Sequence, residues 1–213
     1  MLLAFEGVDG AGKTTQSRLL HRWLSKQGRA VLTEWNSSKY IAPATKKAKQ
    51  KRALTPVTYS LFHAADFADR HERIIRPAVA DGAHVICDRY LHTPLTRDVV
   101  RGCDPAWVRG LYAYALRPDI TFYIQVPAEV ALARKDRKPN WYEAGRDVIP
   151  RCDAYEAFCV YQRRIIDLYE ELKQHFTVID GMLSVKKQQR AIRAAVLERM
   201  GQLADVHCFA HAR

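Results

Sequence analysis

The sequence has no paired cysteine pattern. Its five cysteines are scattered and odd in number, and no two are spaced as C-x-x-C; they are Cys87, Cys103, Cys152, Cys159 and Cys208. A disulfide framework or a zinc site is normally marked by a regular cysteine spacing, so we expect neither. Free thiols of this kind favour a protein of the reducing cytoplasm.

Long apolar runs, internal repeats and low-complexity linkers are also missing. No apolar stretch reaches the roughly 20 residues of a membrane span, so we expect no membrane partner. The apolar residues from position 2 onward are interpreted as a strand and not as a signal peptide. The 213 residues suffice for one α/β domain with a full core. We predict a single domain over residues 1–203 and a C-terminal tail over 204–213.

Acidic residues are few relative to basic ones. The chain has 23 Asp and Glu against 34 Lys and Arg, which gives a formal net charge of +11. Such a field attracts polyanions, including nucleotides and nucleic acid. The densest basic cluster is Lys46, Lys47, Lys49, Lys51 and Arg52. No aromatic residue interleaves these cations, so no motif supports a stacking platform for single-stranded nucleic acid.

A complete phosphate-binding loop stands at the start of the chain. Residues 7–14 read Gly-Val-Asp-Gly-Ala-Gly-Lys-Thr, the G-x-x-x-x-G-K-T pattern. The glycines let backbone N–H groups surround phosphate oxygens, and Lys13 adds a charge near the outer phosphates. The hydroxyl of Thr14 is placed to bind the magnesium ion (Mg²⁺) that accompanies them. The sequence therefore predicts a site for a nucleoside triphosphate such as ATP.

Strand and helix patterns alternate along the chain. Short apolar runs predict strands at 2–6, 30–34, 84–88, 121–126 and 177–180. Helical periodicity predicts helices at 14–26, 56–80, 104–115, 128–137, 154–175 and 186–202. This alternation predicts the three-layer α/β/α fold of phosphate-loop NTPases, with a five-stranded parallel sheet. Ligands of such sheets bind at the carboxyl ends of the strands, which places Asp9, Glu34, Asp88 and Asp180 on one rim.

Three features favour a small-molecule kinase among the proteins with this loop. No Asn-Lys-x-Asp guanine signature occurs. A buried strand ends in Asp88-Arg89-Tyr90, where an aspartate can hold Mg²⁺ through water and an arginine can grip a second phosphate. The basic segment 135–151, interrupted by prolines and a glycine, is predicted to be a mobile lid over the reacting phosphates.

The chain resembles the thymidylate kinases, within the nucleoside-monophosphate kinases. The resemblance covers about residues 2–195. It is carried by the run Phe5–Gln16 and by Ala64-Ala65-Asp66, Ile75-Arg76-Pro77-Ala78, Asp88-Arg89-Tyr90, Arg117-Pro118-Asp119, Pro127–Arg134 and Val178-Ile179-Asp180. It implies transfer of the terminal phosphate of magnesium-ATP to thymidine monophosphate (dTMP), giving the diphosphate. It also implies a homodimer.

The resemblance implies a role for each candidate residue. The catalytic candidates are Lys13, Arg89 and the lid cations Arg137 and Arg146. The ATP-binding candidates are Gly7, Asp9, Gly10, Ala11, Gly12, Lys13, Thr14, Thr15, Arg134 and Asp180. The acceptor-binding candidates are Asp9, Glu34, His63, Phe67, Arg70, Arg89, Tyr90 and Arg97. The metal-binding candidates are Thr14 and Asp88. No general base is required, because the acceptor phosphate is already an anionic nucleophile.

The chain departs from the family pattern on the acceptor side. The family has an aromatic residue that stacks on thymine and, four positions later, an arginine that binds the base; here these positions hold His63 and Phe67. Arg70, about one helical turn later, is a candidate to compensate, and Phe67 is equally a candidate core residue. After the second strand, Glu34 replaces an arginine, and Trp35 offers a stacking face.

Two alternatives to a thymidylate kinase therefore stay open. The first is a phosphate-loop kinase for another nucleotide, a nucleoside or a small phosphorylated metabolite. The second is a non-catalytic module that binds nucleotides or nucleic acid through the positive field of the chain. The presence of Lys13, Thr14, Asp88 and Arg89 argues against the second alternative, and a salt-sensitive, sequence-independent affinity for nucleic acid would argue for it.

Overall fold

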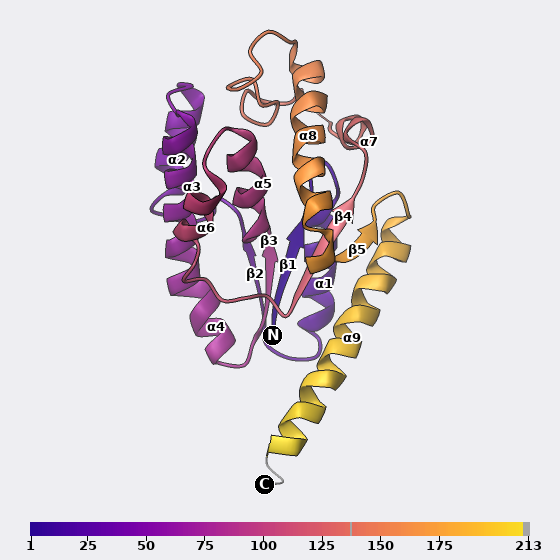
Figure 1. The fold of residues 1–213 in the computed structure, drawn as a ribbon. Coiled ribbons are helices and arrows are strands. Elements are labelled where there is room, and N and C mark those ends of the chain that lie inside the picture. The colour runs from indigo at the N-terminus through magenta and orange to yellow at the C-terminus, as the bar shows by residue number, and fades with distance from the viewer. Residues whose placement is uncertain (137, 211–213) are drawn as a thin grey trace.

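A computed structural model places the chain as one α/β body (Figure 1). The structure describes residues 1–136 and 138–210, with side chains described as far as residue 203. Arg137, a predicted lid cation, lies outside the described residues. Within the described chain, no helix combines the length and the apolar character that a membrane crossing requires.

The sheet has five parallel strands in the order β2-β3-β1-β4-β5. The strands are β1 (Leu2–Glu6), β2 (Ala30–Glu34), β3 (His84–Asp88), β4 (Ile120–Gln125) and β5 (Thr177–Asp180). This confirms the predicted fold class, and four of the five strands have the predicted bounds. In the register, Asp88 pairs with Glu34 on one side and with Phe5 on the other. The strand ends that carry the candidate residues therefore share one rim.

The helices lie in two layers around this sheet. They are α1 (Lys13–Leu24), α2 (Ala42–Gln50), α3 (Pro56–Arg70), α4 (Arg76–Ala80), α5 (His92–Val100), α6 (Pro105–Leu111), α7 (Ala128–Ala133), α8 (Ala154–Glu171) and α9 (Val185–Ala210). A π-helical turn at His71–Ile75 joins α3 to α4, and a 3-10 turn at Lys173–His175 follows α8.

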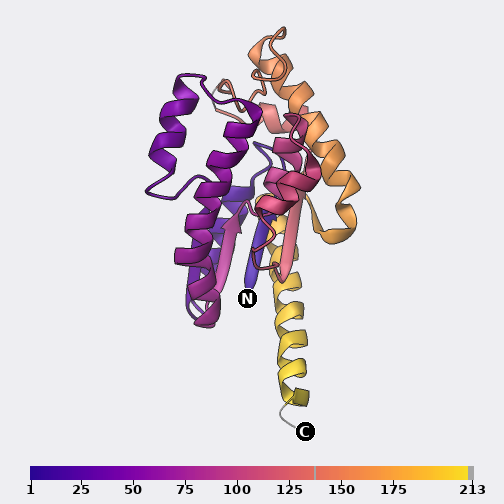
Figure 2. The same cartoon turned by 60° about the vertical axis from the view of Figure 1, so that its left-hand side comes forward.

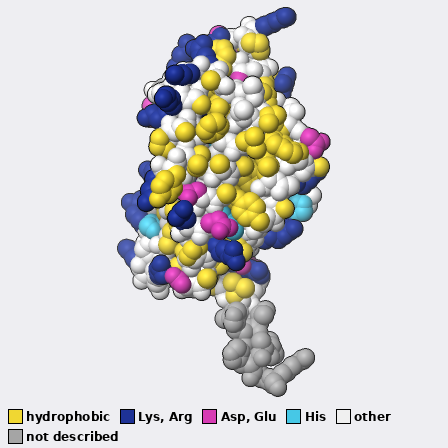
Figure 3. Space-filling model, turned by 90° about the vertical axis from the view of Figure 1, so that its left-hand side faces the viewer, with side chains coloured by type: hydrophobic (Ala, Val, Ile, Leu, Met, Phe, Trp, Pro, Cys, Tyr) yellow, Lys and Arg dark blue, Asp and Glu magenta, His cyan; other side chains and the backbone are white. Residues whose placement is uncertain are grey.

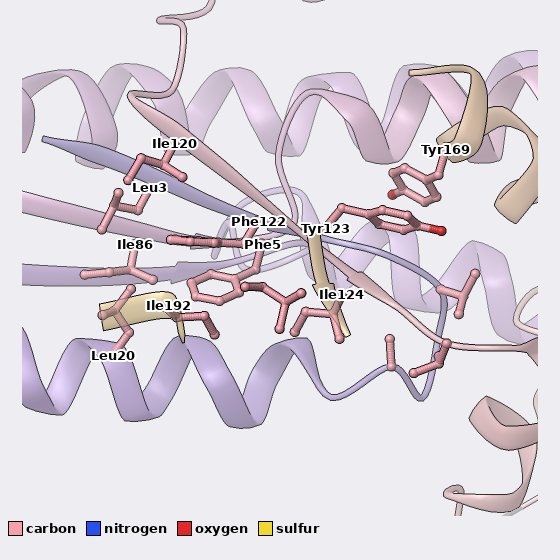
Figure 4. Close-up of a cluster of buried hydrophobic side chains, with 14 of the residues drawn as sticks. Leu3, Phe5, Leu20, Ile86, Ile120, Phe122, Tyr123, Ile124, Tyr169 and Ile192 are labelled. Carbon is pink, nitrogen blue, oxygen red and sulfur yellow. The ribbon is translucent and has the colours of Figure 1, made fainter. Parts of the chain in front are cut away.

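Side chains of alternating strand positions form two cores, because successive residues of a strand point to opposite faces. Phe5 and Phe122 pack with Leu20 of α1 and Ile192 of α9, as Figure 4 shows. Leu2 and Ala4 of the same strand β1 pack toward α3 and α4, in a cluster that includes Phe67, Ile75 and Tyr90. The two cores therefore pack against opposite faces of the sheet whose strand ends form the rim.

The helix predictions need several corrections. The predicted helix 56–80 is interrupted by the π-helical turn. The predicted helices 104–115 and 128–137 end earlier, at Leu111 and Ala133. Helix α9 continues to Ala210, where the sequence suggested a tail without regular structure. Helices α2 and α5 were not predicted. In α2, only Thr45 is buried, so the apolar periodicity that marks a helix is nearly absent.

The basic segment 135–151 contains turns and neither helix nor strand in its described part, as predicted. We call residues 138–151 the lid segment. Figure 2 shows this segment and α2 at the same end of the molecule, where the strands finish. The lid segment is not detached from the body. Arg101, at the end of α5, binds the Asp147 carboxylate at 2.8 Å and the Tyr142 carbonyl oxygen at 2.8 Å.

Candidate active site

The phosphate loop occupies the turn between β1 and α1, the arrangement that the motif requires. Gly7, Gly10 and Gly12 have φ values of 133°, 91° and 99°, in the region that favours glycine. At Gly10 a side chain is also excluded sterically, because a Cβ atom would lie 2.2 Å from the carbonyl oxygen of Ala131. The loop therefore keeps its backbone open toward a ligand.

Lys13 is the first residue of α1, and its side chain is buried. Its Nζ atom donates a hydrogen bond to the carbonyl oxygen of Val8 at 2.6 Å. Burial and, after it, the nearby Arg89 guanidinium lower the pKa of Lys13 to about 7, against the attraction of Asp9 and Asp88. A phosphate bound beside Lys13 would raise this pKa, because its negative charge favours the protonated amine.

Asp9, inside the loop, is held by two arginines from across the rim. Arg97 donates to its Oδ2 atom at 2.7 Å, and Arg89 donates to its Oδ1 atom. Burial alone would raise the pKa of Asp9, but Arg97 and Arg89 outweigh burial and hold the pKa well below its usual range. Asp9 is therefore ionised, and both guanidinium groups are positioned beside the loop where a second phosphate would face the first.

A buried carboxylate, Glu6, holds the loop that carries Arg89. Its oxygens accept hydrogen bonds from the backbone N–H groups of Tyr90, His92 and Thr93 and from the hydroxyls of Thr93 and Tyr169. Arg89 itself has a φ of 74°, which is rare for a residue with a side chain. Sequence reasoning missed this role of Glu6, because all four of these partner residues lie more than 80 positions away in the chain.

The predicted metal ligands meet at the rim. The Thr14 hydroxyl donates to the Oδ2 atom of Asp88 at 2.5 Å. A hydroxyl and a carboxylate are oxygen ligands of the kind that Mg²⁺ prefers, together with waters and substrate phosphates. The pair therefore fits a magnesium ion that arrives with a nucleotide.

A cavity of about 800 Å³ lies over the phosphate loop. All predicted ATP-binding residues line it except Gly7 and Asp180. Asp180 is exposed, and its carboxylate accepts the N–H of Met182. On the far side the cavity is lined by Gln188 and by the residues Met182, Leu183, Ser184 and Val185. Arg134 joins the two sides, because its Nη2 atom donates to the carbonyl oxygen of Gly181 at 2.9 Å.

Three glutamines fix this far side to α1, a contact that the sequence did not suggest. Gln16 of α1 bonds to Gln188 at 3.0 Å, and Gln189 bonds to Gln16 at 2.8 Å. All three side chains are buried. The start of α9 is therefore positioned directly by the helix that follows the phosphate loop.

The predicted acceptor-binding residues separate into two groups. Asp9, Arg89 and Arg97 converge, and Glu34 lines the same cavity while pairing with Arg18 on the surface. The other four are buried: His63, Phe67, Arg70 and Tyr90. The Tyr90 hydroxyl binds the Leu116 carbonyl oxygen in the core. The side chain of Tyr90 therefore packs in the core.

Phe67 and Arg70 lie behind Trp35 and do not reach the cavity. The Phe67 ring packs within 5.1 Å of Tyr90 and Tyr112, between ring centroids. Trp35 lies 6.0 Å from Phe67 and 5.5 Å from the guanidinium carbon of Arg70. Arg70 is fully buried and pairs with Asp66 and Thr33. Phe67 was predicted to be either an acceptor-binding or a core residue, and the structure shows a core residue.

Of the predicted lid cations, Arg146 stacks on Trp141, with 4.8 Å between guanidinium carbon and ring centroid. It does not line the cavity over the phosphate loop. The residue that fixes the lid segment is Arg101, which sequence reasoning missed because its partners lie more than 40 positions away. Its position directly after α5 gave no signal of these contacts.

Comparison with known proteins agrees with this geometry. A sequence model of the family described as "Thymidylate kinase" matches residues 5–192. "Probable thymidylate kinase 2" of Saccharolobus solfataricus is 45% identical over 199 residues, which cover 91% of this chain and 93% of that protein. "Thymidylate kinase" of Geotalea uraniireducens is 32% identical over 215 residues, covering 94% and 98%. "Probable thymidylate kinase" of Pyrococcus abyssi is 28% identical, covering 91% and 94%.

Proposed function

Because the chain belongs to the thymidylate kinase family, we propose that it transfers the terminal phosphoryl group of ATP to dTMP, giving ADP and the diphosphate dTDP. The observation that supports this most strongly is the pair Arg89 and Arg97 on Asp9. Two guanidinium groups beside a phosphate loop suit a reaction between two phosphorylated ligands.

On the donor side, the loop backbone and the N-terminus of α1 would hold the triphosphate. Lys13 would leave the Val8 carbonyl oxygen and pair with the migrating phosphoryl group. The pKa of Lys13 is lowered in the free protein. The negative charge of the phosphates would raise it again and so favour the protonated amine. Arg134 would lie beside the nucleotide between the loop and residues 182–185.

On the acceptor side, Arg89 and Arg97 would turn from Asp9 to the acceptor phosphate. An oxygen of that phosphate attacks the terminal phosphorus of ATP. The bond from this phosphorus to the bridging oxygen breaks, and ADP leaves with the electron pair. No proton has to be removed first, because the attacking oxygen is anionic. The arginines orient the nucleophile and balance charge that spreads over the transferred group.

Thr14 and Asp88 would hold a magnesium ion, which their contact at the rim fits. When bound, Mg²⁺ neutralises charge on the phosphate oxygens. The role left to the chain is to orient these two ligands. The Asp88 position is fixed by strand β3, whose two neighbours pair with it in register.

An assay of ATP consumption coupled to ADP detection tests the proposal. A panel of nucleoside monophosphates and nucleosides serves as acceptors, and dTMP is expected to be the best of them. ADP formation with another acceptor and none with dTMP would contradict the substrate, and no reaction with any acceptor would contradict the kinase itself.

A second acceptor class is favoured by one observation. Phe67, at the position of the family arginine that binds thymine, lies in the core and offers no hydrogen-bond donor. A site without this donor discriminates less strongly between bases. We therefore include other pyrimidine deoxynucleoside monophosphates among the substrates to be tested.

We also propose that the chain forms a homodimer in the cytoplasm. Val57 and Leu61 stand one turn apart on α3 with 51% and 45% of their surface exposed, and Trp107 and Tyr114 are exposed as well. Hydrophobic side chains gather on the side of the molecule that carries α3 and α6 (Figure 3). Such a patch suits a self-complementary interface. Free thiols at Cys87 and Cys103 support a reducing compartment.

A further inference from the structure

Neither Phe67 nor Arg70, the two residues expected to face the acceptor base, supplies a hydrogen-bond donor to it. Phe67 has none, and its ring is fully buried. Arg70 donates through Nε to Asp66 at 2.9 Å and through Nη1 to Thr33 at 3.0 Å. Its Nη2 group has no partner among the described residues, but the side chain is fully buried and lines neither cavity. Trp35 covers both residues. Discrimination between bases by this kinase would therefore depend on another residue.

Lys49, near the end of α2, contacts His63, the residue at the position where the family has its thymine-stacking aromatic. Its Nζ atom lies 3.0 Å from Nε2 of His63 and 4.9 Å from the centroid of the Tyr59 ring. No carboxylate in the described part of the chain lies within ion-pair distance of Nζ. An ammonium group has three donors, and His63 accepts only one of them. Lys49 therefore retains donors for a ligand.

The surroundings of Lys49 favour a neutral His63 and an incoming acceptor group. Burial lowers the pKa of His63 well below its usual value, and Lys49, Arg97 and Arg101 lower it further. Neutral His63 can accept the hydrogen bond from Lys49. Burial lowers the pKa of Lys49, and Arg97 lowers it further, so the amine lies within electrostatic reach of the arginine that would hold the acceptor phosphate.

A second cavity gives Lys49 access to a ligand. Its volume is about 940 Å³, and it lies between α2 and the lid segment. Lys49 lines it from α2, and Trp141 and Tyr142 line it from the lid segment. None of the described residues that line it is an aspartate or a glutamate. The combination of cations with aromatic walls suits a flat base that carries carbonyl oxygens.

We propose that Lys49 is a specificity-determining residue, which donates a hydrogen bond from Nζ to a carbonyl oxygen of the acceptor's pyrimidine base at the inner end of this cavity. The inference rests on the proposed kinase function, and it adds the class of base. Thymine carries a carbonyl oxygen at C4, where cytosine carries an amino group. An ammonium donor pairs with the first and is repelled by the second, so Lys49 favours thymine.

A pair of acceptors that share sugar, phosphate and 5-methyl group, and differ only at C4 and in the proton on N3, tests the inference. These are dTMP and 5-methyl-deoxycytidine monophosphate, compared by kcat/KM in the wild-type enzyme, Lys49→Met and Lys47→Met. Lys47 is an exposed residue of the same helix and lines neither cavity. We expect the wild type and Lys47→Met to prefer dTMP, and Lys49→Met to lose about 10- to 100-fold of that preference. KM for ATP should be unchanged in both variants.

The outcomes separate the two proposals. If the wild type phosphorylates dTMP and 5-methyl-deoxycytidine monophosphate equally well, the role of Lys49 is wrong and the kinase function stands, even if Lys49→Met fails to fold. An unchanged preference in folded Lys49→Met has the same meaning. If the wild type phosphorylates neither acceptor, the proposed function fails and the inference fails with it.

Discussion

Arg101 donates a hydrogen bond from its guanidinium group to the backbone carbonyl oxygen of Arg97, at 3.2 Å. The two residues stand one turn apart at the end of α5 and serve different parts of the site. Arg97 holds Asp9 of the phosphate loop, while Arg101 holds Asp147 and Tyr142 of the lid segment. The loop and the lid segment are thus connected through a single helical turn.

Arg101→Gln is expected to lower the free energy of unfolding by about 3–5 kcal/mol, because it leaves Asp147 without its buried partner. Unfolding in urea measures this value. The control is Arg29→Gln, which removes a surface ion pair with Asp81 and should cost less than about 1 kcal/mol. Similar losses in both variants would show that Arg101 does not anchor the lid segment.

Arg89→Ala is expected to lower kcat/KM for the acceptor monophosphate by roughly 100-fold, because one of the two guanidinium groups beside Asp9 is lost. Affinity for an ATP analogue should change little. Steady-state kinetics and an equilibrium titration measure the two effects. Arg22→Ala, an exposed change on α1, serves as the control. A weaker affinity for ATP alone would contradict the assignment of Arg89 to the acceptor.

The lowered pKa of Lys13 predicts that the protein takes up a proton when a nucleotide binds. This pKa is about 7 in the free protein, so at pH 8 the amine is mostly neutral. Phosphates raise that pKa, so the amine gains a proton as the triphosphate binds. Calorimetry at pH 8 in buffers of different ionisation enthalpy should detect up to about one proton per nucleotide. In Lys13→Met, which should remain folded but inactive, this uptake should disappear; equal uptake would count against the lowered pKa.

Gly10→Ala is expected to destabilise the protein by about 1–3 kcal/mol and to weaken ATP binding, because the new Cβ atom meets the Ala131 carbonyl oxygen at a φ of 91°. The matched change Gly28→Ala meets no atom within 4 Å, and it should be neutral or slightly stabilising. Urea unfolding and nucleotide titration compare the two. The steric argument fails if both variants behave alike.

Leu61→Lys is expected to convert a dimer into a monomer at micromolar concentration, since it places a charge in the exposed apolar stripe of α3. Size-exclusion chromatography with light scattering reports the mass. Leu197→Lys makes the same change at an exposed residue of α9 and should leave the dimer intact. A monomeric wild type, or dissociation by both changes, would refute the proposed interface.

The sequence predicted best those parts that depend on local pattern. Strands β1, β2, β3 and β5 are short apolar runs whose positions alone place Asp9 and Asp88 on one rim. The residues that were missed act across the chain. Glu6 binds backbone groups of residues 90–93, and Arg101 binds residues 142 and 147. Nothing in a local window reveals a partner so distant in sequence.

On the acceptor side, Arg89 was predicted from the strand end that carries it, while the base-binding residues were predicted only by resemblance, and there the packing decided the outcome. Phe67 and Trp35 fill space in an aromatic cluster, while Lys49 arrives from a helix with almost no apolar periodicity. Residue type alone did not distinguish side chains that pack in the core from side chains that line a cavity. The donor side was predicted more completely, because the phosphate loop requires particular residues at fixed spacing.

The left-handed backbone at Arg89 carries a consequence for how the protein can vary. Glycine would suit the conformation and arginine suits the phosphate, so no residue type suits both. Neighbouring residues must then maintain the conformation, and the four hydrogen bonds that Tyr90, His92 and Thr93 donate to Glu6 contribute to this. A substitution at Glu6 would accordingly behave in a genetic screen like a lesion of the catalytic site. Glu6 lines neither of the two cavities.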